Sequence, residues 1–302
     1  MYNILKRIFT IGEKTAVLNV IVNRMVRRVD KLVAQIETRL KSEGVVYRIF
    51  YTDKEGAAIK YGRSLSAAGG REFLIVGGDG TINEVLTGLV DPSVCTIAII
   101  PAGSGNDFAA AANIPLRAKA LDTYFHGTPT AVDYIECGTR RSMNIVGTGI
   151  DVDILRRCGR IKFGSPKGKY FRALLSSLIH YKGTKLRVTV NGRTQEYRAL
   201  IAAVCNGKQL GGGIPLCPPA CIDDGQLELV IVDCPPRYKF PFELIRLMRG
   251  KLLKRPIAHH VACKDALVEG DGALFVQYDG EICEERSLNA RVVSGGLKLY
   301  RG

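Results

Sequence analysis

Two glycine-rich turns in the first half of the chain carry the residue types that bind phosphate. The first, Gly77-Gly78-Asp79-Gly80-Thr81, follows an apolar run at residues 73–76, and the second, Gly103-Ser104-Gly105-Asn106-Asp107, follows another at residues 96–100. Glycines let backbone N–H groups approach an anion closely, and a helix that begins after such a turn adds its positive end. We therefore predict that both turns hold the phosphates of one nucleotide. The sequence contains no Walker A pattern, which excludes a P-loop enzyme.

Asp79 stands in the middle of the first turn, among the N–H groups expected to bind phosphate. A carboxylate there would repel a bare phosphate unless a cation lay between them, so its position predicts a magnesium-bound nucleotide. The alternative is an ordinary tight turn in which Asp79 is a turn residue. Thr81 followed by Glu84 has the spacing of a capping box, which predicts a helix from Ile82.

Alternating strands and helices would position these turns. The sequence predicts strands at residues 17–22, 45–51, 73–76 and 96–100, and helices at 29–40, 56–68, 82–88 and 109–112. Repeated strand–helix units give a parallel α/β sheet, whose ligands lie at the carboxyl ends of the strands. Both glycine turns fall at such ends.

After about residue 131 the pattern changes to short strands separated by turn residues. Strands are predicted at residues 186–190, 197–204, 227–232, 266–268 and 273–278, and helices at 168–181 and 241–254. Asn191-Gly192 between two of these runs is typical of a two-residue hairpin. The second part is therefore predicted to be an all-β domain that carries two helices. The helix at 241–254 is amphipathic, with apolar residues on one face and basic residues on the other. It therefore either packs on its own domain or lies on a membrane surface.

Composition narrows the class of protein and of partner. The 302 residues include 43 Lys and Arg against 29 Asp and Glu, a net charge of +14 that favours an anionic partner. An anionic membrane fits this excess, and so does a solvated basic face with no single partner. There is no tryptophan and no basic strand with interleaved aromatics, so nucleic acid is not expected. The apolar stretches are far shorter than the ~18 residues of a membrane span.

Cysteine usage and the N-terminus bear on location. Nine scattered cysteines, an odd number, predict reduced thiols in the cytoplasm. The closest pair, Cys217 and Cys221, has no histidine nearby, so zinc is not expected. Residues 1–9 place a basic pair inside an apolar stretch without a cleavage site, which argues against a secretory signal and for a mature chain starting at Met1.

Four segments, in order, resemble the diacylglycerol kinase catalytic-domain family, specifically the soluble bacterial lipid kinases related to sphingosine and ceramide kinases. They lie at residues 77–85, 101–109, 223–227 and 278–281, and the resemblance spans nearly the whole chain. It implies an α/β nucleotide-binding domain at residues 1–131, rejoined by a C-terminal segment at about 287–302. A β-sandwich lipid-substrate domain would occupy residues 132–286, with the active site in the cleft between the two.

The resemblance also implies an ATP- and Mg²⁺-dependent lipid kinase, with diacylglycerol as the expected substrate. Glu281 is then the catalytic base, Asp79 acts through magnesium, and Asp279 shares the strand face of Glu281 and orients a metal or water. Read alone, Asp279-Gly280-Glu281 would be an exposed turn with two solvated acids. The residues expected to bind the nucleotide are Asn23, Thr52, Gly77, Gly78, Asp79, Gly80, Thr81, Glu84, Gly103, Ser104 and Asn106.

A second, structural magnesium is implied at Asp224, assisted by backbone carbonyls around Cys221 and Gln226. Read alone, this segment is a hairpin turn. One departure from the family follows Asn23, which is kept, while a basic stretch, residues 24–28, stands where the family usually has a proline and a glycine-containing loop. Two alternatives stay open, and this departure motivates the first of them.

The first alternative is a catalytically silent nucleotide- or lipid-binding homologue. The second is an NAD kinase-like enzyme, which would share the turn at residues 77–81 but not the motifs at 105–108 and 279–281. The resemblance places the protein in the cytoplasm, peripherally associated with an anionic membrane surface that holds its lipid substrate, and a homodimer stays open.

Overall fold

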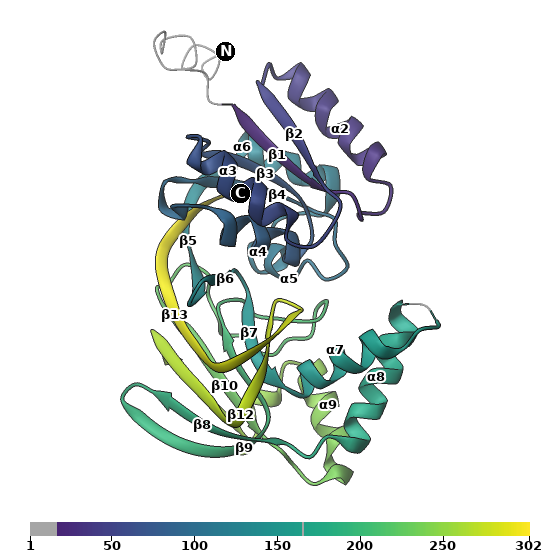
Figure 1. Ribbon diagram of the computed structural model, residues 1–302, viewed down its shortest axis with the longest axis vertical. Coiled ribbons are helices and arrows are strands. Elements are labelled where there is room, and N and C mark those ends of the chain that lie inside the picture. The colour runs from purple at the N-terminus through teal and green to yellow at the C-terminus, as the bar shows by residue number, and fades with distance from the viewer. Residues whose placement is uncertain (1–16, 165) are drawn as a thin grey trace.

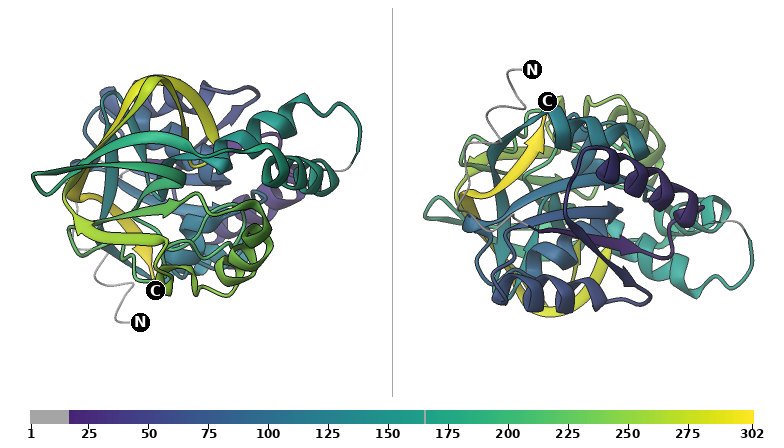
Figure 2. Two further views of the ribbon diagram at one scale, coloured as in Figure 1. Left: turned by 90° about the horizontal axis from the view of Figure 1, so that it is seen from below. Right: turned by 90° about the horizontal axis from the view of Figure 1, so that it is seen from above.

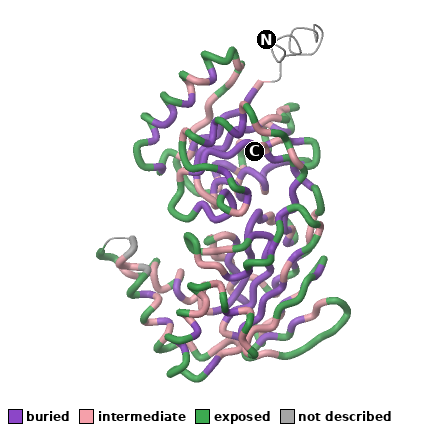
Figure 3. The backbone as a smooth tube through the Cα atoms, turned by 180° about the vertical axis from the view of Figure 1, so that it is seen from behind, coloured by how far each residue is buried: buried purple, intermediate pink, exposed green. Residues whose placement is uncertain are grey.

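The computed structural model describes residues 17–164 and 166–302, so the expectation for the first nine residues lies outside the described part. Figure 1 shows an α/β domain stacked on a β-rich domain, with β13 (Glu281–Arg301) running from one to the other. The chain is most buried at the centre of each domain (Figure 3). The predicted fold class, an α/β domain followed by a β-sandwich-like domain, is confirmed.

The first domain is built on four parallel strands in the order β4-β3-β1-β2. Phe73 to Val76 in β3 are fully buried, as expected for a strand covered on both faces. Its strands are β1 (Leu18–Asn23), β2 (Tyr47–Thr52), β3 (Glu72–Gly77) and β4 (Thr96–Pro101). Its helices are α2 (Val29–Ser42), α3 (Ala57–Ala67), α4 (Asp79–Gly88), α5 (Asp107–Ala111) and α6 (Leu121–His126), with 3-10 turns at η1 (Pro92–Val94) and η2 (Arg117–Ala120).

The second domain is antiparallel, and Asn191-Gly192 forms the predicted two-residue hairpin, with φ of 49° and 74°. The remaining strands are β5 (Thr128–Cys137), β6 (Arg140–Ser142), β7 (Ile145–Gly149), β8 (Thr184–Val190), β9 (Arg193–Cys205), β10 (Leu227–Asp233), β11 (Ala258–Cys263) and β12 (Asp265–Tyr278). The helices are α7 (Ile150–Arg160), α8 (Pro166–His180) and α9 (Phe240–Met248), with η3 (Arg237–Lys239) and η4 (Leu252–Lys254). In Figures 1 and 2 these three helices gather at one edge of the domain.

Several helices differ from expectation, among them α6, which was not predicted. The helix predicted at residues 241–254 ends at Met248, because Gly250 turns the chain with a φ of 64° before η4 begins. Helix α7 was not predicted. Its isoleucines, valine and aspartates have weak intrinsic helix propensity, so the segment carries little helical signal of its own.

Strand β13 joins the domains into one sheet. Its first part pairs antiparallel with β12, its middle and end pair with β5, and Lys298 and Leu299 pair in parallel with β4. The last residues of the chain thus complete the sheet of the first domain.

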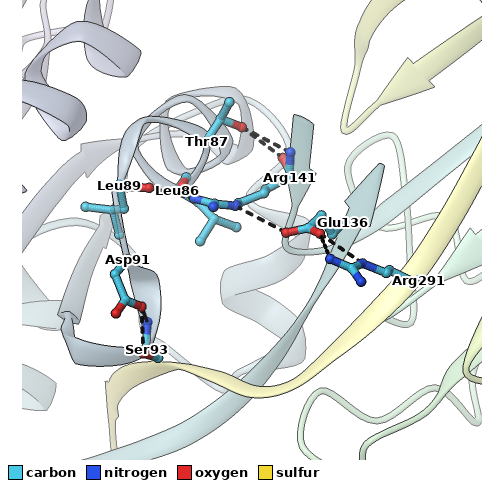
Figure 4. A network of polar contacts seen from close by, with 8 residues as sticks. All are labelled: Leu86, Thr87, Leu89, Asp91, Ser93, Glu136, Arg141 and Arg291. Carbon is cyan, nitrogen blue, oxygen red and sulfur yellow. Dashed lines mark hydrogen bonds and ion pairs between the residues drawn. The ribbon is translucent and has the colours of Figure 1, made fainter. Parts of the chain in front are cut away.

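A polar network also links the domains, and Arg141 on β6 is its centre (Figure 4). Its guanidinium donates to the carbonyls of Leu86 and Leu89, at 3.0 and 2.7 Å, where α4 ends. Glu136 on β5 lies 3.8 Å from the same guanidinium and also pairs with Arg291 on β13. The C-terminal end of α4 is therefore held by the strands that lead into the second domain.

Candidate active site

The first glycine turn leads directly into α4, which begins at Asp79 with Gly78 as its N-cap. The predicted start at Ile82 and the predicted capping box are therefore wrong. Thr81 and Glu84 lie inside the first two turns of the helix, so their side chains reach neighbouring elements instead of the helix's own start. Thr81 Oγ1 accepts a hydrogen bond from Asn23 Nδ2 at 3.0 Å, which ties α4 to the end of β1.

Glu84 caps another helix. Its two carboxylate oxygens accept hydrogen bonds from the N–H groups of Gly56 and Ala58, both at 3.0 Å, at the start of α3. A carboxylate in this position satisfies two N–H groups that have no partner within the helix and complements the positive helix end. Glu84 thereby fixes α3 relative to α4.

Asp79 joins the two glycine turns. Its carboxylate accepts hydrogen bonds from the N–H groups of Asp107 and Phe108, both at 3.1 Å, at the start of α5. The turns touch, because a Cβ on Gly103 would lie 2.5 Å from the Cα of Gly78. Only glycine allows this approach. Burial raises the pKa of Asp79 above its ordinary value, although the two N–H groups oppose that shift.

The second turn is held by Asn106, which has a φ of 56°. Its side-chain oxygen accepts from the Gly103 N–H at 2.8 Å and its amide donates to the Gly103 carbonyl at 3.0 Å. Asp107 reaches into the second domain, where its carboxylate accepts hydrogen bonds from the N–H groups of Gly212 and Gly213, both at 2.8 Å. The carboxylate of Asp107 therefore connects the second glycine turn to the second domain.

Asp279 occupies the two-residue turn between β12 and β13, with a φ of 48°, and is not on a strand. The expectation that it shares a strand face with Glu281 is wrong. Its carboxylate accepts hydrogen bonds from Asn83 Nδ2, Ser142 Oγ and the N–H groups of Asn144 and Ile145. These four hydrogen bonds make Asp279 a link between α4 and the second domain, and its predicted role in orienting a metal or water stays a prediction. Burial nevertheless raises its pKa to about 6.

The side-chain carboxylate of Glu281, two residues later, accepts no hydrogen bond from any described residue. It faces a cavity of about 580 Å³ whose lining includes Asn23, Thr52, Gly80, Thr81 and Glu84, all predicted nucleotide-site residues. Burial, with a smaller contribution from Glu84 and Glu55, raises the pKa of Glu281 to about 7. A carboxylate with a free lone pair and a near-neutral pKa has the properties of a general base.

Two further cavities adjoin this one. The acidic cavity, of about 270 Å³, is lined by Asp79, Ser104, Asp107 and Asp279, and it shares Leu155 and Gly280 with the first cavity. An apolar cavity of about 390 Å³ lies inside the second domain. Asp151 and Leu210 line both the acidic and the apolar cavity.

Asp151 was missed by the sequence analysis. It follows Gly149 at the start of α7, where a strand, a glycine and a helix succeed one another as at the two predicted turns, so the same signal could have found it. Both of its carboxylate oxygens are buried and neither meets the geometry of a hydrogen bond to a described residue, although the Val152 N–H and the Gln277 side chain lie close enough to favour its charged form. Burial raises its pKa to about 6.

The residues predicted to hold a structural magnesium lie in a turn before β10. One oxygen of Asp224 accepts a hydrogen bond from the Gln226 N–H at 2.9 Å, and the Cys221 thiol donates to Asp223 at 3.0 Å. In the part of the chain that the structure describes, no three His, Cys, Asp or Glu side chains cluster as a metal cage would require. The magnesium assignment at Asp224 stays a prediction.

Sequence comparisons agree with this architecture. Residues 18–137 match the diacylglycerol kinase catalytic domain, and residues 144–301 match the YegS C-terminal NAD kinase beta sandwich-like domain. The chain is 31% identical over 199 residues to a Yersinia enterocolitica protein named "Probable lipid kinase YegS-like", covering 63% of this chain and 66% of that protein. A protein of the same name from Enterobacter sp. strain 638 is 31% identical over 210 residues, covering 67% and 70%.

Solved structures show the same fold. A Bacillus anthracis str. Sterne protein provisionally named a diacylglycerol kinase superposes with a TM-score of 0.77 at 23% identity, covering 97% of this chain and 98% of that one. Another crystal structure from the same strain, described as a diacylglycerol kinase, gives 0.70 at 21%, covering 96% and 98%. The fold is thus that of diacylglycerol kinase-like proteins. The family matches go further: the chain belongs to the diacylglycerol kinase catalytic-domain family, in its YegS-like lipid kinase branch.

Proposed function

We propose that the protein transfers the γ-phosphoryl group of ATP to the hydroxyl of a lipid, with diacylglycerol as the substrate and phosphatidic acid as the product. One observation carries the proposal: the cavity lined by nucleotide-site residues adjoins the acidic cavity, which in turn adjoins the apolar cavity. Such a path suits a reaction between a polyphosphate and an acyl-chain lipid.

The nucleotide phosphates would lie against the two glycine turns, where N–H groups and the side chains of Thr52, Thr81 and Ser104 are available. Magnesium keeps most of its ligands as water and substrate phosphates and takes one or two from protein carboxylates. The absence of a cage of three acids among residues 17–164 and 166–302 is consistent with that mode. Asp79, beside both turns, is the carboxylate we assign to the magnesium side, where the ion would neutralise charge developing on the phosphates.

Glu281 would act as the base. Its free carboxylate accepts the proton of the lipid hydroxyl as that oxygen bonds to the γ-phosphorus and the bond to the ADP oxygen breaks. Asp279 would position the Glu281 carboxylate without touching the substrate. Its four hydrogen bonds hold α4 and the second domain against the turn that directly precedes Glu281.

Asp151 would receive the headgroup. Its buried oxygens, which make no well-formed hydrogen bond, lie where the acidic cavity meets the apolar one, which is where the polar end of an acyl-chain lipid must stop. Unpaired buried polar groups are costly, so a ligand hydroxyl in hydrogen-bond reach would be held there.

Incubation of the purified protein with Mg²⁺, γ-labelled ATP and a total lipid extract tests the proposal. We expect label in phosphatidic acid, identified by mass. Parallel incubation with NAD should give no NADP. Nucleotide-dependent thermal stabilisation without any labelled lipid would instead establish the catalytically silent alternative.

A further inference from the structure

Helices α8 and α9 present apolar side chains to solvent. On α8 the residues Phe171, Leu175 and Ile179 follow one another every fourth position and are 64, 51 and 52% exposed. On α9 the exposed residues are Phe242 and Ile245, at 59 and 48%. No described residue covers these faces, and exposed apolar groups that cluster on neighbouring elements mark an interaction surface.

Adjoining faces of the same helices line the apolar cavity. Leu174 and Leu178 of α8 and Leu244 and Leu247 of α9 all contact it. Met248 belongs to both sets, because it lines the cavity and is 56% exposed. The cavity therefore reaches the surface beside the exposed apolar faces.

The charge on both helices has one sign. Helix α8 contains no Asp or Glu, and its Arg172 is exposed. The single acid of α9, Glu243, is only 4% exposed and pairs with Arg246 and Arg255. Arg249 follows α9 directly and is exposed. The apolar faces are thus flanked by cations without exposed acids on either helix.

From this arrangement we infer that α8 and α9 dock on an anionic lipid bilayer, with their exposed apolar side chains among the acyl chains and their arginines at the phosphate level. Apolar insertion flanked by basic residues is the mode of interfacial helices. A second copy of the chain fits less well, because two such surfaces would bring like charges together. The inference rests on the proposed lipid kinase function, since it places the mouth of the apolar cavity at the membrane that holds the substrate. In the described part of the chain, no helix is both long and apolar enough to cross a bilayer.

Vesicle co-sedimentation tests the surface. Wild-type protein should bind vesicles of phosphatidylcholine with phosphatidylglycerol at least tenfold more tightly than vesicles of phosphatidylcholine alone. The double variant Phe171→Ser/Ile245→Ser and the double variant Arg172→Glu/Arg249→Glu should each lose at least tenfold of that binding. None of these four residues lines a cavity, so activity on detergent-solubilised short-chain diacylglycerol should stay unchanged.

The matched control is Val90→Ser/Val94→Ser, which removes two valines that are 61 and 48% exposed on the first domain and should leave vesicle binding unchanged. Equal binding by wild type and both docking variants would overturn the inference. So would a wild-type dimer in sedimentation velocity that dissociates in Phe171→Ser/Ile245→Ser. The docking surface and the kinase function can fail separately. If the two docking variants lose vesicle binding while the wild-type protein phosphorylates no lipid, the docking surface is supported and the proposed kinase function is refuted.

Discussion

Two acids separated by one glycine have different tasks because their surroundings differ. The Asp279 carboxylate accepts hydrogen bonds from four donors, on α4, on β6, at Asn144 and on β7, whereas the Glu281 carboxylate accepts none from the described residues and faces the nucleotide cavity. The pKa values of both carboxyls are raised by burial, yet only in Glu281 are both oxygens without a donor and available to a substrate proton. The role of each carboxylate follows from its partners more than from its pKa.

The pH dependence of turnover should report Glu281. A base must be ionised, so kcat/KM should rise with pH through about 7, the pKa of Glu281 in the free enzyme. Glu55 lines the same cavity and its charge contributes to that raised pKa, so Glu55→Gln should move the limb to lower pH. Steady-state kinetics between pH 5 and pH 9 measure this. Glu281→Gln should lower turnover by about 10²–10⁴-fold and abolish the limb. An unmoved limb in Glu55→Gln would exclude Glu281 as its source.

The buried carboxylate of Asp151 should lower the free energy of unfolding when it is ionised. Its pKa is about 6 in the fold against an ordinary 3.8, so the folded state binds the proton more tightly than the unfolded chain does. The group therefore costs nothing below pH 3.8 and destabilises the fold increasingly as pH rises to about 6. We expect Asp151→Asn to raise the free energy of unfolding at pH 8 by on the order of 1–3 kcal/mol, with little gain at pH 4, and to lower lipid phosphorylation. Urea titrations at both pH values test this, and equal gains at the two would contradict it.

At the scale of elements, α3 and α4 cross at two glycines. A Cβ on Gly88 would lie 2.3 Å from the Ile59 carbonyl oxygen, and one on Gly62 would lie 2.7 Å from that of Val85. Because the obstacles are backbone atoms, Gly88→Ala must push the helices apart, and we expect a loss of about 1–3 kcal/mol in the free energy of unfolding. The control is Gly159→Ala in α7, where a Cβ meets nothing within 4 Å, and it should be neutral or stabilising. Equal losses in the two variants would argue against the crossing as the cause.

The sequence predicted elements best where the signal is local. The apolar run of β3 and the Asn191-Gly192 hairpin each carry their own pattern, and both were found in place. The start of α4 was misplaced because Thr81 and Glu84 have capping-box spacing while their side chains bind β1 and α3. Such partners lie far away in the chain, so spacing alone cannot distinguish a residue that caps its own helix from one that caps another.

At the scale of the whole molecule, the candidate site was predicted in its parts but not in its connections. The glycine turns and Glu281 could be named from motifs that occupy a few residues each. The partners of Asp279 are 134 to 196 positions away in sequence, and Asp107 meets glycines 105 and 106 positions on. Those contacts form because the two domains pack together, and β13, which returns to the first domain, is one of the elements that join them.

The Arg141 network should therefore affect catalysis through domain placement. Arg141 holds the C-terminal end of α4, and the same helix carries Asp79 and Asn83 toward the cleft. Arg141→Ala leaves the Leu86 and Leu89 carbonyls without this donor. We therefore expect the free energy of unfolding to fall by about 1.5–3 kcal/mol and kcat to decrease. KM for ATP should change less, because both glycine turns stay within the first domain. Arg291→Ala is the control, since it removes only the exposed partner of Glu136 and should leave stability almost unchanged. Thermal unfolding and steady-state kinetics of both variants test this prediction. Equal effects in the two variants would show that the hydrogen bonds from Arg141 to α4 do not fix the relative position of the domains.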